Sequence, residues 1–509
     1  MILFSVLLNE IADGYLATNS TWNSANTAEL MTIVGIYVHA FFLIFAVGFP
    51  IVVLTLESIG IARKDDDYIN LARNASKLWG ITFAAGAVTG TLVEFGLVVV
   101  WSGTIALMAS MAAAPLIIEL YAFIIEIVLI GTYLTTFGKI KRWRYGHVLI
   151  GVGVLIGSNL SAYAILAVNA WMQVPWGTGN MVSQFFLPWV PTLGPLVIDP
   201  SKLKTLATVL PIVGSSLLSS PGAFQLLSNF TSNPWIALFN PESNATYFHN
   251  LLAALIVTSF LAASYLSFKI IRGYGLPAYN WKGLKVSFFI ASIATFLQAV
   301  AGDYQGRLLY MYQRNIFNAT EGIPPRGGYD PIVSILLYGN PSHFFPGSDY
   351  LASLLPQNDS LGQLTLNATN LYGPILHLMY YAMVVSGVIL AVIAVGHFGL
   401  YSKLLRKIVE GILRIKVETF VLYGSFAGAI LSIVASVTGW ATREMGRHPW
   451  TVYGLITYND VVNSHSITPL FTAAIIALEI GILMAGLWGI YMIFFKKLKA
   501  KHGGGVHYQ

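Results

Sequence analysis

Long apolar segments alternate with short polar connections along this chain, and this pattern predicts its fold class. A helix needs about 20 mostly apolar residues to cross a bilayer. Nine segments meet this requirement, at 30–58, 78–101, 115–138, 147–172, 249–271, 284–302, 371–400, 417–440 and 467–495. We therefore expect an all-α, polytopic membrane protein with about nine transmembrane helices, and residues 1–509 forming a single membrane domain.

Composition supports this expectation. Of the 509 residues, 56% are hydrophobic and only 10% are charged, and the mean hydropathy is +0.69. Soluble globular proteins carry about a quarter of charged residues. The composition therefore excludes an ordinary soluble domain.

Basic residues predict how the chain is oriented in the membrane. The basic residues gather in every second connection, at 63–77, 139–144, 269–285, 403–416 and after residue 495, which together hold 21 of the 28 Lys and Arg. By the positive-inside rule the N-terminus lies outside and the C-terminus inside. The net charge of +6 is thus an orientation signal, and we expect no nucleic-acid partner.

Two long connections fall on the predicted outer side. Residues 174–248 are rich in Pro, Gly, Ser and Asn and are expected to form an outer cap insertion, and residues 303–370 form a second outer loop. Acceptor triplets for N-glycosylation lie on this predicted outer side. They are a weak signal, because chance often produces such triplets. They are Asn19, Asn229, Asn244, Asn318, Asn358 and Asn367. Glycans there would suit an archaeal or eukaryotic cell surface.

The chain contains no cysteine. Disulfides, iron–sulfur ligation and covalent haem attachment through Cys are therefore excluded on this chain. Any redox centre must be held by His, Met or carboxylate side chains.

The most distinctive short stretch is Gly439–Trp450, with the sequence GWATREMGRHPW, at the predicted outer end of an apolar segment. A helix end can pack without two Trp, two Arg, a Glu and a His within twelve residues, so this stretch indicates a further role. Ionisable residues at membrane depth usually mark functional sites. We expect a bound anionic or metal-bearing group here, with Glu444 as a ligand or proton carrier and Arg447 as its counter-charge.

Few other polar residues in the apolar segments are candidate ligands. His39 lies among aliphatic and aromatic residues, where an imidazole needs a cofactor or a hydrogen-bonding helix partner. His249 opens the fifth segment, where an interfacial His is the simpler interpretation. Met383 lies within the seventh, where a lone Met is usually core filler.

Carboxylates within the apolar segments are candidates for proton transfer. Glu119 and Glu126 are seven residues apart, which places them on one helix face. Glu94 lies on the preceding segment and Glu57 near the inner end of the first. A single buried Glu is most often a protonated helix–helix hydrogen bond, but three near one helix pair favour a proton relay.

The stretch Gly439–Trp450 resembles the GWxxxExGRQPW signature of subunit I of the cytochrome bd quinol oxidases, with His448 in place of the usual Gln. Other motifs of that family follow in the same order from about residue 30 to 465. They are His39, Gly48 and Glu57 at intervals of nine, Thr89-Gly90-x-x-x-Glu94-Phe95, Ala114-Pro115-x-x-x-Glu119, Gly157–Ala162, Val168–Gln173, Asn240-Pro241 with His249, and Gly302-Asp303 with Gly306.

The resemblance implies a set of haem ligands. His249 and Met383 would be the two axial ligands of a low-spin haem b. His39 and Glu444 would be the ligands of two high-spin haems, a haem b and a chlorin-type haem d or a third haem b. Trp440 would lie between haems on the electron path, and the haems would lie near the outer face.

The resemblance is weakest where quinol oxidases bind their donor. In the loop 303–370, Gln313 and Glu321 match the family pattern and are candidate quinol contacts. Ile316 stands in place of a Lys of the family, and Tyr381 in place of an Arg. A donor other than quinol is therefore an alternative.

The resemblance implies a copper-free terminal oxidase subunit in the cell membrane. It would oxidise quinol at the outer side, reduce O2 to water with protons drawn from inside through Glu119 and Glu126, and thereby build a proton gradient. A second large membrane subunit is expected, either subunit II or a subunit I-like paralogue. A proton- or cation-coupled transporter is the alternative from another class, because intramembrane Glu residues also occur there. A haem–copper oxidase is disfavoured, because the clustered His residues are absent.

Overall fold

The computed structural model of the chain describes residues 24–101, 104, 108, 112–140, 143–179, 193–196, 233–356, 359–461 and 468–496. Within these residues, nine helices are long and apolar enough to cross a membrane, as the hydrophobic pattern predicts. They are α2 (Ser24–Arg63), α3 (Asp66–Val100), α5 (Ala113–Thr136), α6 (Arg144–Gln173), α10 (Ser243–Ile271), α11 (Pro277–Tyr312), α15 (Ser360–His397), α17 (Val417–Arg447) and α19 (Pro469–Phe494).

Short elements connect these helices. The short helices are η1 (Phe137–Lys139), α12 (Arg314–Glu321), α13 (Pro331–Tyr338), α14 (Ser348–Ser353), η2 (Phe398–Leu400), α16 (Lys403–Leu413) and α18 (Tyr458–Val461). Three two-stranded antiparallel pairs join β1 (Thr178–Gly179) to β2 (Leu193–Leu196), β3 (Gly328–Tyr329) to β4 (Phe344–Phe345), and β5 (Trp450–Val452) to β6 (Ile456–Thr457).

Helix ends carry the expected local chemistry. The side chains of Asp330, Ser402 and Thr468 accept backbone N–H groups at the starts of α13, α16 and α19. Such caps satisfy N–H groups that have no partner within the helix. α3 carries Asp66 and Asp67 in its first turn, where acidic side chains favour a helix N-terminus, and it begins before the predicted span.

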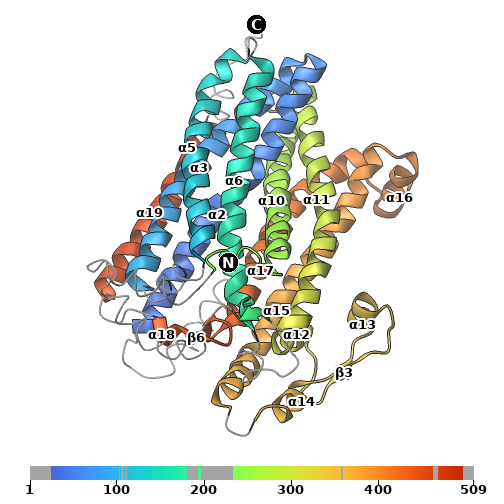
Figure 1. Ribbon diagram of the computed structural model, residues 1–509. Helices are drawn as coiled ribbons and strands as arrows, with labels where there is room; N and C mark the ends of the chain where they lie inside the picture. The colour runs from blue at the N-terminus through green and yellow to red at the C-terminus, as the bar shows by residue number, and fades with distance from the viewer. Residues whose placement is uncertain are drawn as a thin grey trace.

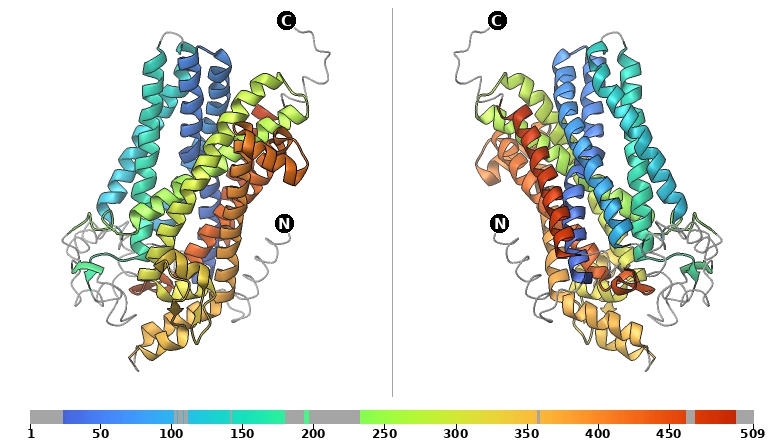
Figure 2. Two further views of the ribbon diagram at one scale, coloured as in Figure 1. Left: turned by 90° about the vertical axis from the view of Figure 1, so that its right-hand side faces the viewer. Right: turned by 90° about the vertical axis from the view of Figure 1, so that its left-hand side faces the viewer.

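The long helices run side by side as one bundle (Figure 1). The short connections α2–α3, α5–α6 and α10–α11 lie toward one end, and the segments with α12, α14 and α18 lie toward the other (Figures 1 and 2). The connections rich in Lys and Arg are therefore at the same end of the bundle. This agrees with the charge alternation, while the side of the membrane that each end faces stays a prediction.

The core lies where α2, α3, α5, α10 and α11 meet. Its largest fully buried side chains include Phe49, Trp79, Tyr133, Phe260 and Phe288. A close approach of α2 to α10 depends on Gly48, because a Cβ there would lie 2.6 Å from the carbonyl oxygen of Ala254. Any larger residue at position 48 would push the two helices apart.

The structure describes only part of the predicted outer cap and of the predicted glycosylation acceptors. Most of the predicted cap 174–248 lies outside the described residues, as do Asn19, Asn229 and Asn358. Of the described acceptors, Asn244 and Asn367 are exposed, but Asn318 is buried and its Nδ2 donates to the carbonyl of Pro346. The folded loop thus covers the amide of Asn318, and glycosylation on this side of the chain stays a prediction.

Candidate functional site

His39 lies on the side of α2 that faces α3. Its Nδ1 is 3.2 Å from the hydroxyl oxygen of Thr89. The facing residue on α3 is Gly90, where a Cβ would lie 2.9 Å from Cε1 of the imidazole. The ring of His39 thus occupies space that the missing side chain of Gly90 leaves, and it remains only half-buried.

His249 and Met383 also face glycines. His249, in the second turn of α10, lies opposite Gly302 of α11, and a Cβ on Gly302 would lie 3.7 Å from its Cε1. Met383 of α15 lies against Gly439 of α17, where a Cβ would be only 2.8 Å from the sulfur. In the described part of the chain, Nδ1 of His249 is buried without a hydrogen-bond partner.

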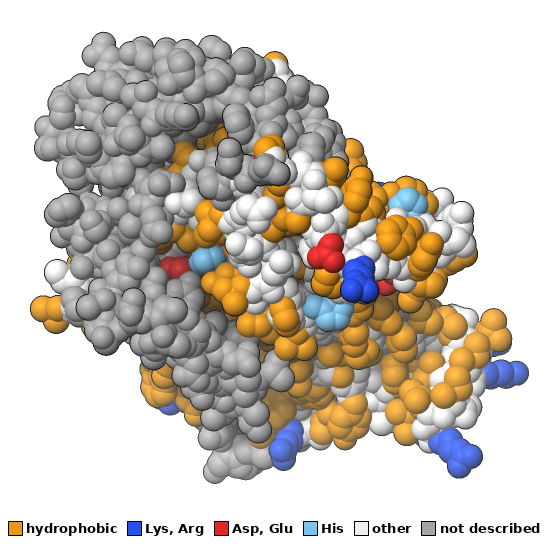
Figure 3. Space-filling view, turned by 90° about the horizontal axis from the view of Figure 1, so that it is seen from below, with side chains coloured by type: hydrophobic (Ala, Val, Ile, Leu, Met, Phe, Trp, Pro, Cys, Tyr) orange, Lys and Arg blue, Asp and Glu red, His pale blue; other side chains and the backbone are white. Residues whose placement is uncertain are grey.

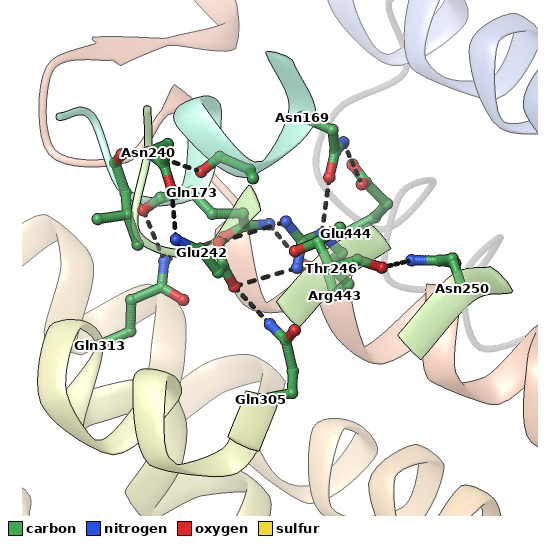
Figure 4. A network of polar contacts seen from close by, with 12 residues as sticks. Asn169, Gln173, Asn240, Glu242, Thr246, Asn250, Gln305, Gln313, Arg443 and Glu444 are labelled. Carbon is green, nitrogen blue, oxygen red and sulfur yellow. Dashed lines mark hydrogen bonds and ion pairs between the residues drawn. The ribbon is translucent and has the colours of Figure 1, made fainter. Parts of the chain in front are cut away.

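The C-terminal end of α17 presents its charged residues to α6 and α10 (Figure 4). Arg443 forms an ion pair with Glu242, at 3.2 Å between Nη1 and Oε1, and its Nε donates to Oδ1 of Asn169 at 2.6 Å. The amide of Asn169 donates in turn to Glu444 at 3.2 Å, and Arg447 donates to the other Glu444 oxygen at 2.5 Å. Asn169 therefore joins the Arg443 pair to the Glu444 pair.

Amide side chains extend this network across the bundle. Gln305 of α11 donates to Glu242 at 2.5 Å. Gln173 of α6 donates to the carbonyl of Arg443 at 3.2 Å and accepts from Gln313 at 3.0 Å. Glu242, Gln173 and Gln313 are all buried. The network fixes these ends of α6, α10, α11 and α17 relative to one another.

The three predicted relay carboxylates differ in their surroundings. Glu126 is buried on α5 beside Gly157 of α6, and its Oε1 has no hydrogen-bond partner within the described residues. Glu119, two turns away, is half-buried and accepts a hydrogen bond from Ser161 at 3.2 Å. Glu94 is exposed on α3 and, in the described part of the chain, makes no hydrogen bond to either. The structure thus places two of the three at one helix interface.

Comparison with known proteins decides which family this arrangement belongs to. Residues 28–502 match the family model described as cytochrome bd terminal oxidase subunit I. The chain belongs to this family. Membership implies haem cofactors, and it leaves the transporter alternative without support.

Individual members of the family are distant from this chain. The cytochrome bd ubiquinol oxidase subunit 1 of Bacillus subtilis (strain 168) is 24% identical over 483 residues, which cover 91% of this chain and 90% of the relative. The cytochrome bd-II ubiquinol oxidase subunit 1 of Escherichia coli (strain K12) is 31% identical over 193 residues, 37% of each chain. The solved bd oxidase structure from Geobacillus thermodenitrificans shares the fold, with a TM-score of 0.70, 22% identity, and coverage of 93% of this chain and 99% of that one.

The two predicted quinol contacts, Gln313 and Glu321, lie in different surroundings. Gln313 points to Gln173 in the buried network, as Figure 4 shows. Glu321, at the far end of α12, is half-buried and accepts a hydrogen bond from the hydroxyl of Tyr381 at 3.3 Å. Burial raises the pKa of the Glu321 carboxyl, and the bonded tyrosine hydroxyls lower it in part. Of the two, only Glu321 is joined to α15.

Family departures have local structural consequences. Ile316 is buried and packs on Gly446 of α17, where a Cβ would lie 3.1 Å from its Cγ2. His448 lies between the rings of Tyr372 and Tyr458, with centroids 4.9 and 5.1 Å away. Burial lowers the pKa of His448 to about 4, so its imidazole is neutral at physiological pH. Trp440, beside Gly439, is half-buried.

One buried polar cluster was not recognised in the sequence. Glu57, Tyr133 and His147 are buried near the basic end of the bundle. The hydroxyl of Tyr133 donates to Glu57 at 2.5 Å, and Nδ1 of His147 lies 2.7 Å from the other carboxyl oxygen. Nε2 of His147 donates to the carbonyl of Tyr133 at 3.0 Å. The proton between His147 and Glu57 therefore decides whether this cluster is neutral or an ion pair.

Glu479 on α19 was also missed. It is buried, and its Oε2 has no partner among the described residues. Its other oxygen lies against Gly35 of α2, where a Cβ would be 2.5 Å away. A lone Glu in an apolar helix carries no spacing pattern, so only the packing of α19 on α2 reveals its burial.

Proposed function

We propose that this chain is the haem-bearing catalytic subunit of a copper-free terminal oxidase that oxidises quinol at the outer side and reduces O2 to water. The observation that carries the proposal is the convergence of the Gly439–Trp450 stretch with His249 and Met383 at one end of the bundle. A proton gradient would follow if quinol protons leave outside while the protons of water come from inside.

The candidate ligands fit a haem. An imidazole nitrogen that is buried without a partner, such as Nδ1 of His249, is costly unless another group engages the ring. Gly439 and Gly90 have no side chain, which lets Met383 and His39 lie close against the backbones of α17 and α3. Nε and Nη1 of Arg447 are buried and have no partner within the described residues, so they suit a haem propionate.

Each residue then has a role. His249 and Met383 would hold a low-spin haem b, and His39 and Glu444 two high-spin haems, of which one is haem b and the other haem d or haem b. Bound haem supplies the electron transfer and the oxygen chemistry. Arg447 and Asn169 orient the Glu444 carboxylate, and Trp440 lies beside the Gly439 that borders Met383.

Protons would reach the site along the interface of α5 and α6. Ser161 holds Glu119 at its Oε1, and Glu126 presents an unpartnered Oε1 two turns further along the same helix. Because a carboxyl in apolar surroundings favours its neutral form, each can carry a proton without leaving a charge in the membrane. Glu94, exposed on α3, lies near enough to Glu119 for the two carboxyls to interact electrostatically, and we place it at the start of this route.

The donor is proposed to be quinol, with Glu321 as the proton acceptor and Gln313 in a supporting position. A raised carboxyl pKa makes Glu321 a better base for a quinol hydroxyl. The alternative, a bd-like oxidase with another donor, is favoured by one observation. Ile316 is buried, so the position of the family's Lys offers no cation at the site.

A second large membrane subunit, subunit II or a subunit I-like paralogue, is proposed as partner. The face of α5 with Ile117, Tyr121, Ile124 and Val128 is exposed and apolar, as a helix covered by lipid or by another subunit would be.

Oxygen consumption by the purified complex tests the function. We expect O2 uptake that depends on added quinol and is lost in Glu444→Gln. Glu418→Gln, on the same helix but paired with Arg406 at an exposed position, is the matched control and should keep full activity. Oxygen uptake with a soluble reductant but not with quinol would favour the alternative donor. A complex that contains haem but reduces no O2 with any donor would contradict the proposal.

A further inference from the structure

Helix α13, in the loop between α11 and α15, has one face fastened to the protein and one face free. Val333 and Ser334 are buried, and Val333 packs with Phe317 and Phe345. On the opposite side Ile332, Ile335 and Leu336 are exposed by 73%, 52% and 53%. Their spacing of three and four residues places them on one stripe of the helix. The helix contains no charged residue.

The depth of α13 is set by its contacts with α11. Arg307 donates to the carbonyls of Leu336 and Leu337 and pairs with Asp303 at 2.8 Å. Arg307 lies five residues before the end of α11, at Tyr312, which corresponds to about 7.5 Å along the helix axis. The end of α13 therefore lies level with the last turns of a membrane-spanning helix, and Figure 1 shows it beside the bundle rather than beyond its end.

The neighbouring surface of α11 is itself apolar and exposed. Val300 is 70% exposed, and Tyr304 and Met311 continue the same side toward the end of the helix. A surface of this kind on a membrane-spanning helix faces lipid. The exposed stripe of α13 lies beside this surface of α11, because Arg307 holds the end of α13 against α11. Tyr329 precedes α13 and Tyr338 is its last residue; both are exposed, and tyrosines are enriched at membrane interfaces.

We propose that α13 lies in the outer interface of the lipid bilayer, with Ile332, Ile335 and Leu336 in contact with lipid. Interfacial helices bury their apolar face about 5–10 Å into the boundary between headgroups and acyl chains. Arg307 lies five residues beyond the predicted apolar span 284–302, about 7.5 Å along the helix axis, so the end of α13 lies at the level of the headgroups. Arg307 satisfies the last carbonyls of α13, so the helix end loses little by leaving water. Seen from the end of the bundle that carries this loop, hydrophobic side chains cover much of the described surface (Figure 3).

The anchoring requires only that the chain spans a membrane. One consequence rests on the proposed function: the loop 303–370 would meet a lipid-soluble quinol at the level of the bilayer. A failure of the quinol proposal would leave the position of α13 unchanged, and the two are measured separately.

The absence of cysteine makes the test direct, because a single introduced thiol is unique in this chain. Ile332→Cys and Ile335→Cys are labelled with a nitroxide in the intact complex, reconstituted in lipid nanodiscs, and unmodified complex gives the background from the partner. Collision rates with O2, which partitions into lipid, and with a water-soluble nickel chelate are then measured. Val300→Cys on α11 is the lipid control, and Tyr350→Cys on α14, which is 52% exposed and lies further out in Figure 1, is the water control.

We expect both α13 labels to match position 300, with at least a several-fold higher ratio of O2 to nickel collisions than position 350. Labels that match position 350 would overturn the proposal, because α13 would then face water. Labels reached by neither reagent would also overturn it, because the stripe would then be covered by protein.

Discussion

Replacing Gly439 by alanine tests the assignment of Met383 as a haem ligand. The added Cβ would lie 2.8 Å from the sulfur of Met383 and 3.7 Å from its Cγ. Ordinary non-bonded contacts are about 3.5–4.0 Å, so the thioether must move by about 0.7–1.2 Å or the helices must separate. Alanine is a better helix former than glycine, so α17 itself is not weakened.

The structure allows the size of the effect to be worked out. Overpacking in a well-packed core costs about 1–3 kcal/mol. If Met383 is bound to haem iron, this cost falls on the bound form and lowers the ratio of ligated to unligated states by about 5- to 150-fold. The absorption and magnetic circular dichroism of the low-spin haem should therefore shift toward a high-spin form. Haem content should stay the same, because His249 is untouched.

Gly302→Ala is the matched control for this experiment. Its Cβ would lie 3.7 Å from His249, an ordinary contact, so the low-spin spectrum should persist. A Gly439→Ala protein that keeps the full low-spin signal, with unfolding followed by tryptophan fluorescence unchanged, would refute the placement of Met383 beside the iron.

Three further predictions concern other residues. Glu242→Gln should destabilise the protein by about 3–5 kcal/mol, because it leaves Arg443 with a buried, uncompensated charge. Thermal unfolding followed by tryptophan fluorescence measures this loss of stability. A double variant with Arg443→Gln should lose less stability than the sum of the two single losses. Glu126→Gln should lower O2 reduction about 10²-fold while haem content is kept, and unchanged turnover would exclude Glu126 from the proton route. Burial raises the pKa of Glu321, and its active carboxylate is lost as the pH falls through that raised pKa. Activity should therefore decline on the acid side at a higher pH than for an ordinary carboxyl. Glu321→Gln should lower activity and abolish this acid-side decline, and an unchanged pH profile would contradict the assignment.

Much of the fold could be predicted because the bilayer imposes it. An apolar run long enough to span must be helical, since backbone groups have no water to bond in the membrane. All nine predicted spans correspond to helices. Their ends were less predictable, as with α2, which begins at Ser24, and α3, which begins at Asp66. Polar residues outside the apolar core can continue a helix or end it, and the choice depends on caps and packing.

The site was predictable where its residues are adjacent in sequence. Arg443, Glu444 and Arg447 lie within one helical turn and a half of α17, and the pattern alone indicated their importance. Their partners Glu242 and Asn169 come from other helices, about 200 and 270 residues away. No local pattern predicts such pairing.

The structure separates the two candidate quinol contacts, Gln313 and Glu321. Gln313 directly precedes α12, a helix of eight residues, and Glu321 is its last residue. One therefore faces the buried network and the other faces α15. A short helix separates residues that a linear motif groups together.

The reduced-minus-oxidised absorption spectrum of the purified complex, with extraction and typing of its haems, is the decisive measurement of whether His39, His249, Met383 and Glu444 hold haem. We expect three haems, including a low-spin haem b whose low-spin signal is lost in Met383→Leu, and a band in the red if one of them is haem d. A pure, folded complex without haem would exclude these residues as haem ligands.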